Sequence, residues 1–247
     1  MRSLPNRGSR SWIEPLTDWL SPQEWQAVTL SLKVSLWAVA ASLPFGVLVA
    51  YALARWRFPG RQVLNGLVHL PLILPPVVTG YLLLLGFGRR GIFGAPLAEW
   101  FGIVFAFRWT GAALAAAVMA FPLMVRTIRL AIEAVDPRLE QAAATLGGGR
   151  AAVFATITLP LILPGILAGC IIAFAKAMGE FGATITFVSN IPGQTQTLPS
   201  AIYTELQVPG GEAQAARLVA VSLVIALAAL LASEWAGRAV ARRIAGA

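Results

Sequence analysis

The chain alternates long apolar segments with short polar connections. An apolar stretch of about 20 residues can cross a bilayer as a helix, because a helix satisfies its own backbone hydrogen bonds where water is absent. Five segments have this character, and they run from about Ala27 to Trp56, Val63 to Gly88, Thr110 to Arg126, Val153 to Met178 and Leu218 to Trp235. The third continues as a polar-faced helix to Val135. The pattern predicts an all-α membrane protein with about five transmembrane helices.

Two regions lie outside this pattern. Residues 1–26 are basic and then polar, and they lack the apolar core that a signal peptide needs. Their tryptophans, Trp12, Trp19 and Trp25, favour the headgroup level, so we expect an interfacial segment followed by one transmembrane domain over residues 27–247. Residues 179–217 are rich in proline and glycine, and we expect irregular structure there with a short helix near Pro199–Gln207.

Composition agrees with a membrane location. The 247 residues are 57% hydrophobic and 12% charged, whereas soluble domains are about 25% charged. The formal net charge of +8 comes largely from arginines near the apolar spans, where anionic lipid attracts them, and no basic patch interleaved with aromatic residues indicates a nucleic-acid partner. More arginines lie after the first span, around residues 126–150 and after the last span than in the other connections. The positive-inside rule therefore predicts that residues 136–160 and the C-terminus are cytoplasmic and the N-terminus is outside.

Side chains that usually carry metal or redox chemistry are scarce. The chain has one cysteine, Cys170, inside an apolar segment, and one histidine, His69. A disulfide within the chain and a histidine-rich metal site are therefore excluded. No carboxylate or nucleophile stands beside His69 in the sequence. We expect no catalytic residue, no metal site and no cofactor.

The polar segment 136–160 has the most informative local pattern. Asp136 suits a helix N-cap, and Pro137 suits the first helical position. One face of the helix that follows is apolar and flat, and it carries Leu139, Ala142, Ala143 and Leu146. The glycines at 147–149 end the helix and permit a sharp turn, because glycine reaches positive φ at low cost. Arg150 then begins a second helix that enters the bilayer.

This segment resembles the EAA loop of permease subunits of bacterial ABC importers. The loop pattern reads Glu-Ala-Ala, three residues, Gly, nine residues and then Ile-x-Leu-Pro. The matching positions here are Gln141, Ala142, Ala143, Gly147, Ile157, Leu159 and Pro160. Gln141 stands where the pattern has glutamate, and the neighbouring Glu140 is the nearest carboxylate that could substitute for it. A plain connection between spans is the default interpretation of a loop, but the spacing favours the EAA loop.

The resemblance extends over nearly the whole chain to molybdate importer permeases. The stretches that carry it are EWQAVTLSLKVS, FPGR, HLPLILPPVVTGYLLL, AVMAFPLMVRTIRLAIEAVD and GEFGATITFVSNIPGQTQTLPSAIY. Sulfate permeases share the loop but match the last stretch less closely. The resemblance implies a type I ABC importer permease that forms a homodimer in the bacterial inner membrane. It also implies two cytoplasmic ABC ATPase subunits that contact the loop, a periplasmic molybdate-binding protein, and import of molybdate, with tungstate or sulfate as alternatives.

Two polar regions near the spans are candidates for the transport path. Prolines free backbone carbonyls and bend a membrane helix, so the region 75–80 either lines a pore or marks a packing kink. Glu180 follows Lys176 by one helical turn, which favours a mutual ion pair over a role in ion passage. Threonines after it could contact a passing anion weakly, or could pack between helices. The candidate pore or gate residues are Pro75, Pro76, Thr79, Glu180, Thr184 and Thr186.

Two other classes of membrane protein predict different sequence features. An ion-coupled secondary transporter tends to carry inverted repeats and several charges at the bilayer midplane, and neither is visible here. An intramembrane enzyme needs paired aspartates, a serine–histidine pair or a histidine–glutamate metal site, which a chain with one histidine makes improbable. The chain also lacks the G-x-x-x-x-G-K-[ST] loop that cradles nucleotide phosphates, so an ATPase that drives it is expected to be a separate chain.

Overall fold

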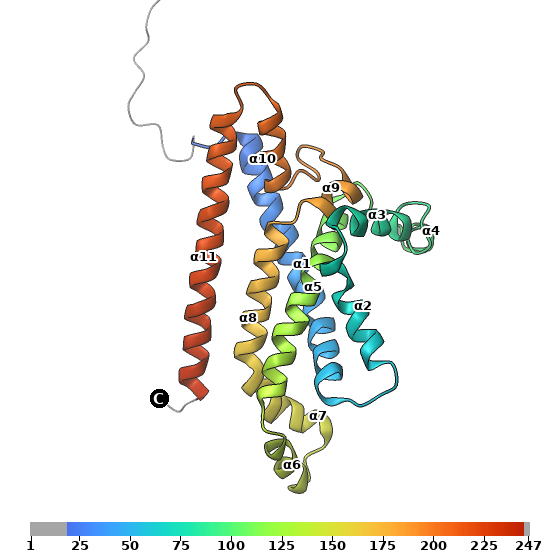
Figure 1. Ribbon diagram of the computed structural model, residues 1–247, viewed down its shortest axis with the longest axis vertical. Coiled ribbons are helices and arrows are strands. Elements are labelled where there is room, and N and C mark those ends of the chain that lie inside the picture. The colour runs from blue at the N-terminus through green and yellow to red at the C-terminus, as the bar shows by residue number, and fades with distance from the viewer. Residues whose placement is uncertain (1–18, 245–247) are drawn as a thin grey trace, which may run out of the picture.

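The computed structural model describes residues 19–244, and these residues form helices without any β-strand (Figure 1). The elements are α1 (Pro22–Arg55), α2 (Arg61–Ile73), α3 (Pro76–Phe87), α4 (Gly94–Phe101), α5 (Trp109–Ala134), α6 (Pro137–Thr145), α7 (Arg150–Val153), the π-helix η2 (Phe154–Thr158), α8 (Leu159–Met178), α9 (Gly182–Val188), α10 (Leu198–Gln207) and α11 (Glu212–Ile244).

The first helix starts earlier than the apolar pattern predicts. Ser21 and Glu24 form a capping box that fixes the start of α1 at Pro22, inside the segment assigned to residues 1–26. Trp19 and Trp25 are both more than half exposed. Trp12 and the rest of residues 1–18 lie outside the described residues.

Four helices are long and apolar enough to cross a membrane, and they correspond to four of the predicted spans. They are α1, α5, the run Ala151–Met178 and the Glu212–Ala232 part of α11. Helices α1, α5 and α8 form the core of the bundle, and α11 packs against α8 at its edge (Figure 1). A Cβ built on Gly165 of α8 would lie 2.1 Å from the Cβ of Ala131 on α5. Small residues therefore set the close approach of these helices, as is typical in membranes.

The predicted second span, Val63 to Gly88, is divided into two helices at the prolines that were expected to bend it. Helices α2 and α3 are bent by 116° at the break between them. Leu74 is extended, with φ −70° and ψ 143°, because the residue before a proline avoids the α region. Pro75 has no backbone N–H to continue α2, and Pro76 starts α3. The bent pair is one broken crossing or a re-entrant loop, so the described residues provide four spans, or up to five.

The region 179–217 is more regular than the sequence predicts. Helix α10 (Leu198–Gln207) matches the expected short helix. Helix α9 is an additional element that the sequence pattern does not predict. With 7 residues it is too short for helical periodicity to stand out, and glycine at its first position argues against a helix.

The connections divide between two ends of the molecule. The α1–α2 connection, helix α6 and the C-terminal end of α11 lie at one end, at the bottom of Figure 1. The start of α1 and helix α10 lie at the opposite end. The arginine-rich connections around Arg55 and Arg138 thus share one end, as expected when an even number of crossings separates them along the chain.

Candidate functional site

Helix α6 forms as its local sequence predicts. The carboxylate of Asp136, the N-cap, accepts a hydrogen bond from the backbone N–H of Arg138 at 2.9 Å. After the helix, Gly147 has a φ of +89°, in the left-handed region that glycine enters readily. The backbone N–H of Gly148 donates to the carbonyl of Ala143 at 3.2 Å. This turn reverses the chain toward α7 and returns it to the bundle.

Helix α6 presents its apolar face away from its own bundle. None of its 9 residues is buried. Leu139 is 50% exposed, and Leu146, the C-cap, is 89% exposed. Gln141 and Ala142 are exposed as well, whereas Ala143 is partly buried. Because α6 projects beyond the ends of the long helices (Figure 1), this face is available to a protein partner rather than covered by the bundle.

The second half of the segment 136–160 connects α6 to a membrane helix. Helices α7, η2 and α8 follow one another without a break. Ile157 and Leu159 are partly buried, and Leu159 packs against the main core. Pro160 directly follows the π-helical turn, inside this continuous run, where its missing N–H removes one backbone hydrogen bond. A displacement at the start of α7 would therefore move one continuous helical run. A π-helical turn within such a run is rare and frequently marks a functional position.

Among the described residues, every side-chain hydrogen bond that joins α6 to another element ends at Glu140. Its Oε1 accepts a hydrogen bond from Thr158 Oγ1 at 2.8 Å and lies 3.4 Å from Arg55 Nη2. The same Nη2 donates to the carbonyl of Val135 at 2.9 Å. Gln141, at the glutamate position of the loop pattern, points elsewhere because successive residues of a helix lie about 100° apart.

The candidate pore residues lie on, or directly before, two short helices that pack against each other. Helices α3 and α9 approach so closely that a Cβ on Gly80 would lie 2.5 Å from the carbonyl oxygen of Ala183 and 2.9 Å from the Cβ of Thr186. A Cβ on Gly182 would lie 2.8 Å from the Cβ of Pro76. The fold thus brings together two regions that are far apart in the sequence (Figure 1).

The candidate threonines differ in how their hydroxyl groups are satisfied. Thr184 donates to the carbonyl of Phe181, and Thr186 donates to the carbonyl of Gly182, both at 2.8 Å within α9. Thr79 on α3 is buried, and its Oγ1 has no hydrogen-bond partner. A buried hydroxyl without a partner costs about 1–3 kcal/mol. Thr79 therefore has hydrogen-bonding capacity that the fold does not use.

Glu180 has a structural role at the start of α9. It is 2% exposed, and its Oε1 accepts a hydrogen bond from the backbone N–H of Ala183 at 2.9 Å. The expected ion pair is present, with Lys176 Nζ 3.1 Å from the other carboxylate oxygen. Both carboxylate oxygens are thus occupied by partners within the chain.

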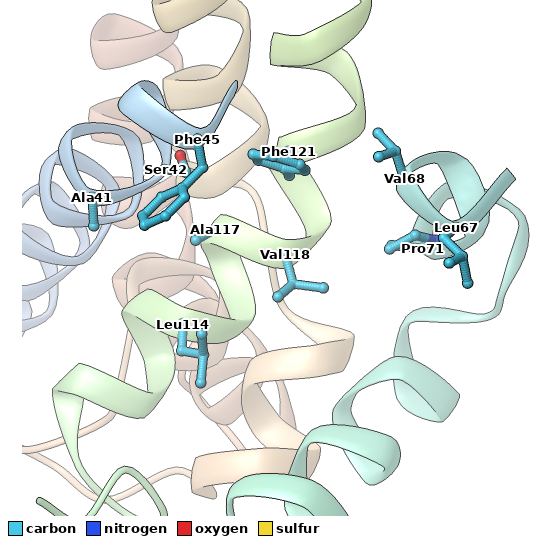
Figure 2. A pocket seen from close by; sticks show the side chains of 10 residues that line it. All are labelled: Ala41, Ser42, Phe45, Leu67, Val68, Pro71, Leu114, Ala117, Val118 and Phe121. Carbon is cyan, nitrogen blue, oxygen red and sulfur yellow. The ribbon is translucent and has the colours of Figure 1, made fainter. Parts of the chain in front are cut away.

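A cavity of about 520 Å³ lies between α1, α2 and α5 (Figure 2). Apolar side chains line it almost entirely, and the lining residues are Ala41, Ser42, Phe45, Leu67, Val68, Pro71, Leu114, Ala117, Val118 and Phe121. The hydroxyl of Ser42 donates to the carbonyl of Ala38 at 2.7 Å. Such a cavity offers an oxyanion no compensation for lost hydration, so it is unsuited to hold one.

Comparison with known proteins decides the family. Residues 42–246 match the family of binding-protein-dependent transport system inner membrane components. The chain belongs to this family. It is 63% identical to the molybdenum transport system permease protein ModB of Escherichia coli K12, over 92% of this chain and 99% of that protein. It is 52% identical to ModB of Haemophilus influenzae, over 90% of this chain and 96% of that protein.

More distant relatives define the fold of this inner membrane component. The sulfate transport system permease protein CysT of Escherichia coli K12 is 35% identical, over 87% of this chain and 78% of that protein. A solved bacterial ABC transporter involved in alginate import matches with a TM-score of 0.68 at 20% identity, covering 92% of this chain and 82% of that chain. The predicted fold class, an all-α permease of the ABC importer type, is therefore confirmed.

Proposed function

We propose that the chain is the pore-forming subunit of an ATP-driven importer that carries molybdate across the bacterial inner membrane. The observation that carries this proposal is the 63% identity to a molybdenum transport system permease over nearly the full length of both chains. The sulfate permease reaches 35%. Molybdate and tungstate are nearly equal in size and charge, and sulfate differs mainly in radius, so tungstate and sulfate are the alternatives.

The proposed assembly contains two copies of this subunit, two cytoplasmic ABC ATPase subunits and a periplasmic molybdate-binding protein. Residues 27–247 form its transmembrane domain, and the coupling loop 136–160 meets the ATPase. The exposed apolar face of α6 supports this contact, because Leu139 and Leu146 would lose water on entering a groove. Its position at the same end as the arginine-rich connections supports a cytoplasmic location for the loop and the C-terminus.

In this mechanism the chain performs no chemistry of its own. ATP binding closes the ATPase dimer and draws the two coupling loops together, and the pore opens toward the loaded binding protein. Hydrolysis and release of the nucleotide return the pore to the inward-facing state. Nucleotide can bias the pore only through contacts that differ between the two states. The exposed residues of α6 provide such contacts. The continuous helix from α7 to α8 transmits the movement of α6 into the membrane.

We propose further that the anion passes near the α3–α9 pair. The candidate residues remain Pro75, Pro76, Thr79, Glu180, Thr184 and Thr186. The 116° break before α3 and the partnerless hydroxyl of Thr79 support a polar path here. Glu180 would act by fixing the start of α9 rather than by touching the anion, which its charge would repel. Few and weak contacts suit a path that must release what it admits.

Reconstitution tests the proposed function directly. The permease, its cognate ATPase and its binding protein are placed in proteoliposomes, and ATP turnover and uptake are measured with molybdate, tungstate and sulfate in turn. We expect molybdate to stimulate both, and uptake to require ATP without an ion gradient. Stimulation by sulfate alone would overturn the substrate assignment, and uptake driven by an ion gradient without ATP would identify a secondary transporter.

A further inference from the structure

We propose that Arg55, Glu140 and Thr158 fix the position of the coupling helix α6 relative to its own membrane helices, and that the efficiency of coupling depends on this contact. These three residues with the carbonyl of Val135 are called the Glu140 cluster below. The inference rests on the proposed function, because it concerns how the coupling loop transmits movement. It assigns positioning roles to two further residues. Arg55 lies outside the loop pattern, and Thr158 occupies one of its variable positions.

The Glu140 cluster joins four elements at one point. Arg55 is the last residue of α1, and Val135 is the C-cap of α5. Glu140 lies in the first turn of α6, and Thr158 is the last residue of η2. One carboxylate oxygen accepts the hydrogen bond of Thr158 and faces the guanidinium of Arg55, while that guanidinium also holds the carbonyl of Val135.

The charges in the cluster are placed favourably. Arg55 lies where the carbonyl ends of α1 and α5 concentrate partial negative charge, and Glu140 lies at the amino end of α6. The side chains of Arg55 and Glu140 are 17% and 18% exposed, and Thr158 is 1% exposed. The ion pair is therefore shielded from water more than a surface pair, so loss of one partner leaves the other poorly solvated.

The rest of α6 offers little else to hold it. It has no buried residue, so apolar packing does not fix its orientation. The Thr158 hydroxyl ties α6 to the π-helix that continues into α8, in addition to the covalent path through the glycine turn. With the cluster intact, movement of α6 reaches α1, α5 and α8 together. Without it, α6 can follow the ATPase while the membrane helices respond less.

The test uses the assembled importer in proteoliposomes and measures molybdate transported per ATP hydrolysed. Glu140→Gln removes the charge at nearly constant size, and Thr158→Val removes the hydroxyl. Each is expected to lower the ratio by roughly fivefold or more, a typical allosteric coupling, with ATPase binding unchanged.

The double variant is expected to match the lower single variant, because both changes break one cluster. Arg55→Lys keeps the charge and is expected to retain more coupling than Arg55→Met.

Glu133→Gln is the matched control. It breaks another carboxylate–arginine pair, with Arg129 at 2.8 Å, on the cytoplasmic half of α5. That pair does not involve α6, so the ratio is expected to stay at the wild-type value. An unchanged ratio in Glu140→Gln and Thr158→Val would overturn the proposal and leave the proposed function intact. Loss of ATPase binding or assembly in both variants would also overturn it, whereas failure of the wild-type complex to transport would overturn the function itself.

Discussion

At the scale of single residues, Gly147 is required for its backbone conformation and Gly80 for its small size. Gly147 has a φ of +89°, and a Cβ there would meet no atom within 4 Å. Its requirement is therefore conformational and not steric. Gly149, in the same turn, also has open space around it, but its φ lies outside the left-handed region. The two positions separate the effect of backbone conformation from that of an added side chain.

We expect Gly147→Asp to uncouple transport from ATP hydrolysis. A non-glycine residue in the left-handed region costs roughly 1–2 kcal/mol, so the turn would shift and displace α6. Gly147→Ala should have an effect at least as strong, because alanine enters the left-handed region less readily than aspartate. Gly149→Ala should transport like wild type. Molybdate uptake and ATP turnover of the reconstituted importer provide the measurement. Normal uptake by an assembled Gly147→Asp complex would contradict this account.

Gly80 is required for its size. A Cβ there would lie 2.5 Å from the carbonyl oxygen of Ala183, so α3 and α9 would have to separate. We expect Gly80→Ala to destabilise the protein by about 1–3 kcal/mol, the usual cost of overpacking. Thermal unfolding of the purified subunit in detergent measures this change. Gly66→Ala on α2 is the control, because no atom lies within 4 Å of its Cβ, and equal stability of the two variants would disprove the close packing.

At the scale of elements, helix α6 and its glycine turn were predictable from local backbone preferences, whereas features that depend on long-range contacts were less predictable. Asp136, Pro137 and Gly147 define the start and end of α6 through backbone preferences that need no tertiary information. Pro75 and Pro76 predict a bend, but not that it is a break of 116°, because proline can either kink a membrane helix or end it, depending on what packs nearby. The contact of Arg55 with Glu140 spans 85 residues, and nothing in the sequence links them.

Helix α6 should bind the ATPase through its apolar face. Leu146→Glu places a charge at a side chain that is 89% exposed and so should leave the fold of the subunit unchanged. Burying a leucine contributes about 1.5–3 kcal/mol, so we expect the affinity for the ATPase to fall by at least tenfold. Co-purification of the two subunits provides the measurement.

Leu206→Glu is the control for this prediction. Leu206 is 60% exposed on α10, at the opposite end of the molecule, and its replacement should not affect ATPase binding. Equal retention of the ATPase by both variants would place the contact elsewhere.

At the scale of the whole molecule, the proposed anion path and the proposed ATPase contact lie at different ends of the bundle. The α3–α9 pair lies toward one end, and α6 lies at the other (Figure 1). The continuous run from Ala151 to Met178 links α6 to the chain just before α9. In the proposed mechanism, movement of α6 reaches the α3–α9 pair through this continuous helical run and needs no chain of individual side-chain contacts.

The most direct test measures the distance between the two copies of α6. A spin label is attached at Thr145→Cys, an exposed position on α6, in a Cys170→Ser background that removes the one natural cysteine. Pulsed electron paramagnetic resonance is then recorded on the assembled importer with and without a non-hydrolysable ATP analogue. We expect one defined distance, which shortens when the analogue binds. An unchanged distance in a complex that binds the analogue, or no defined distance between two labels, would contradict it.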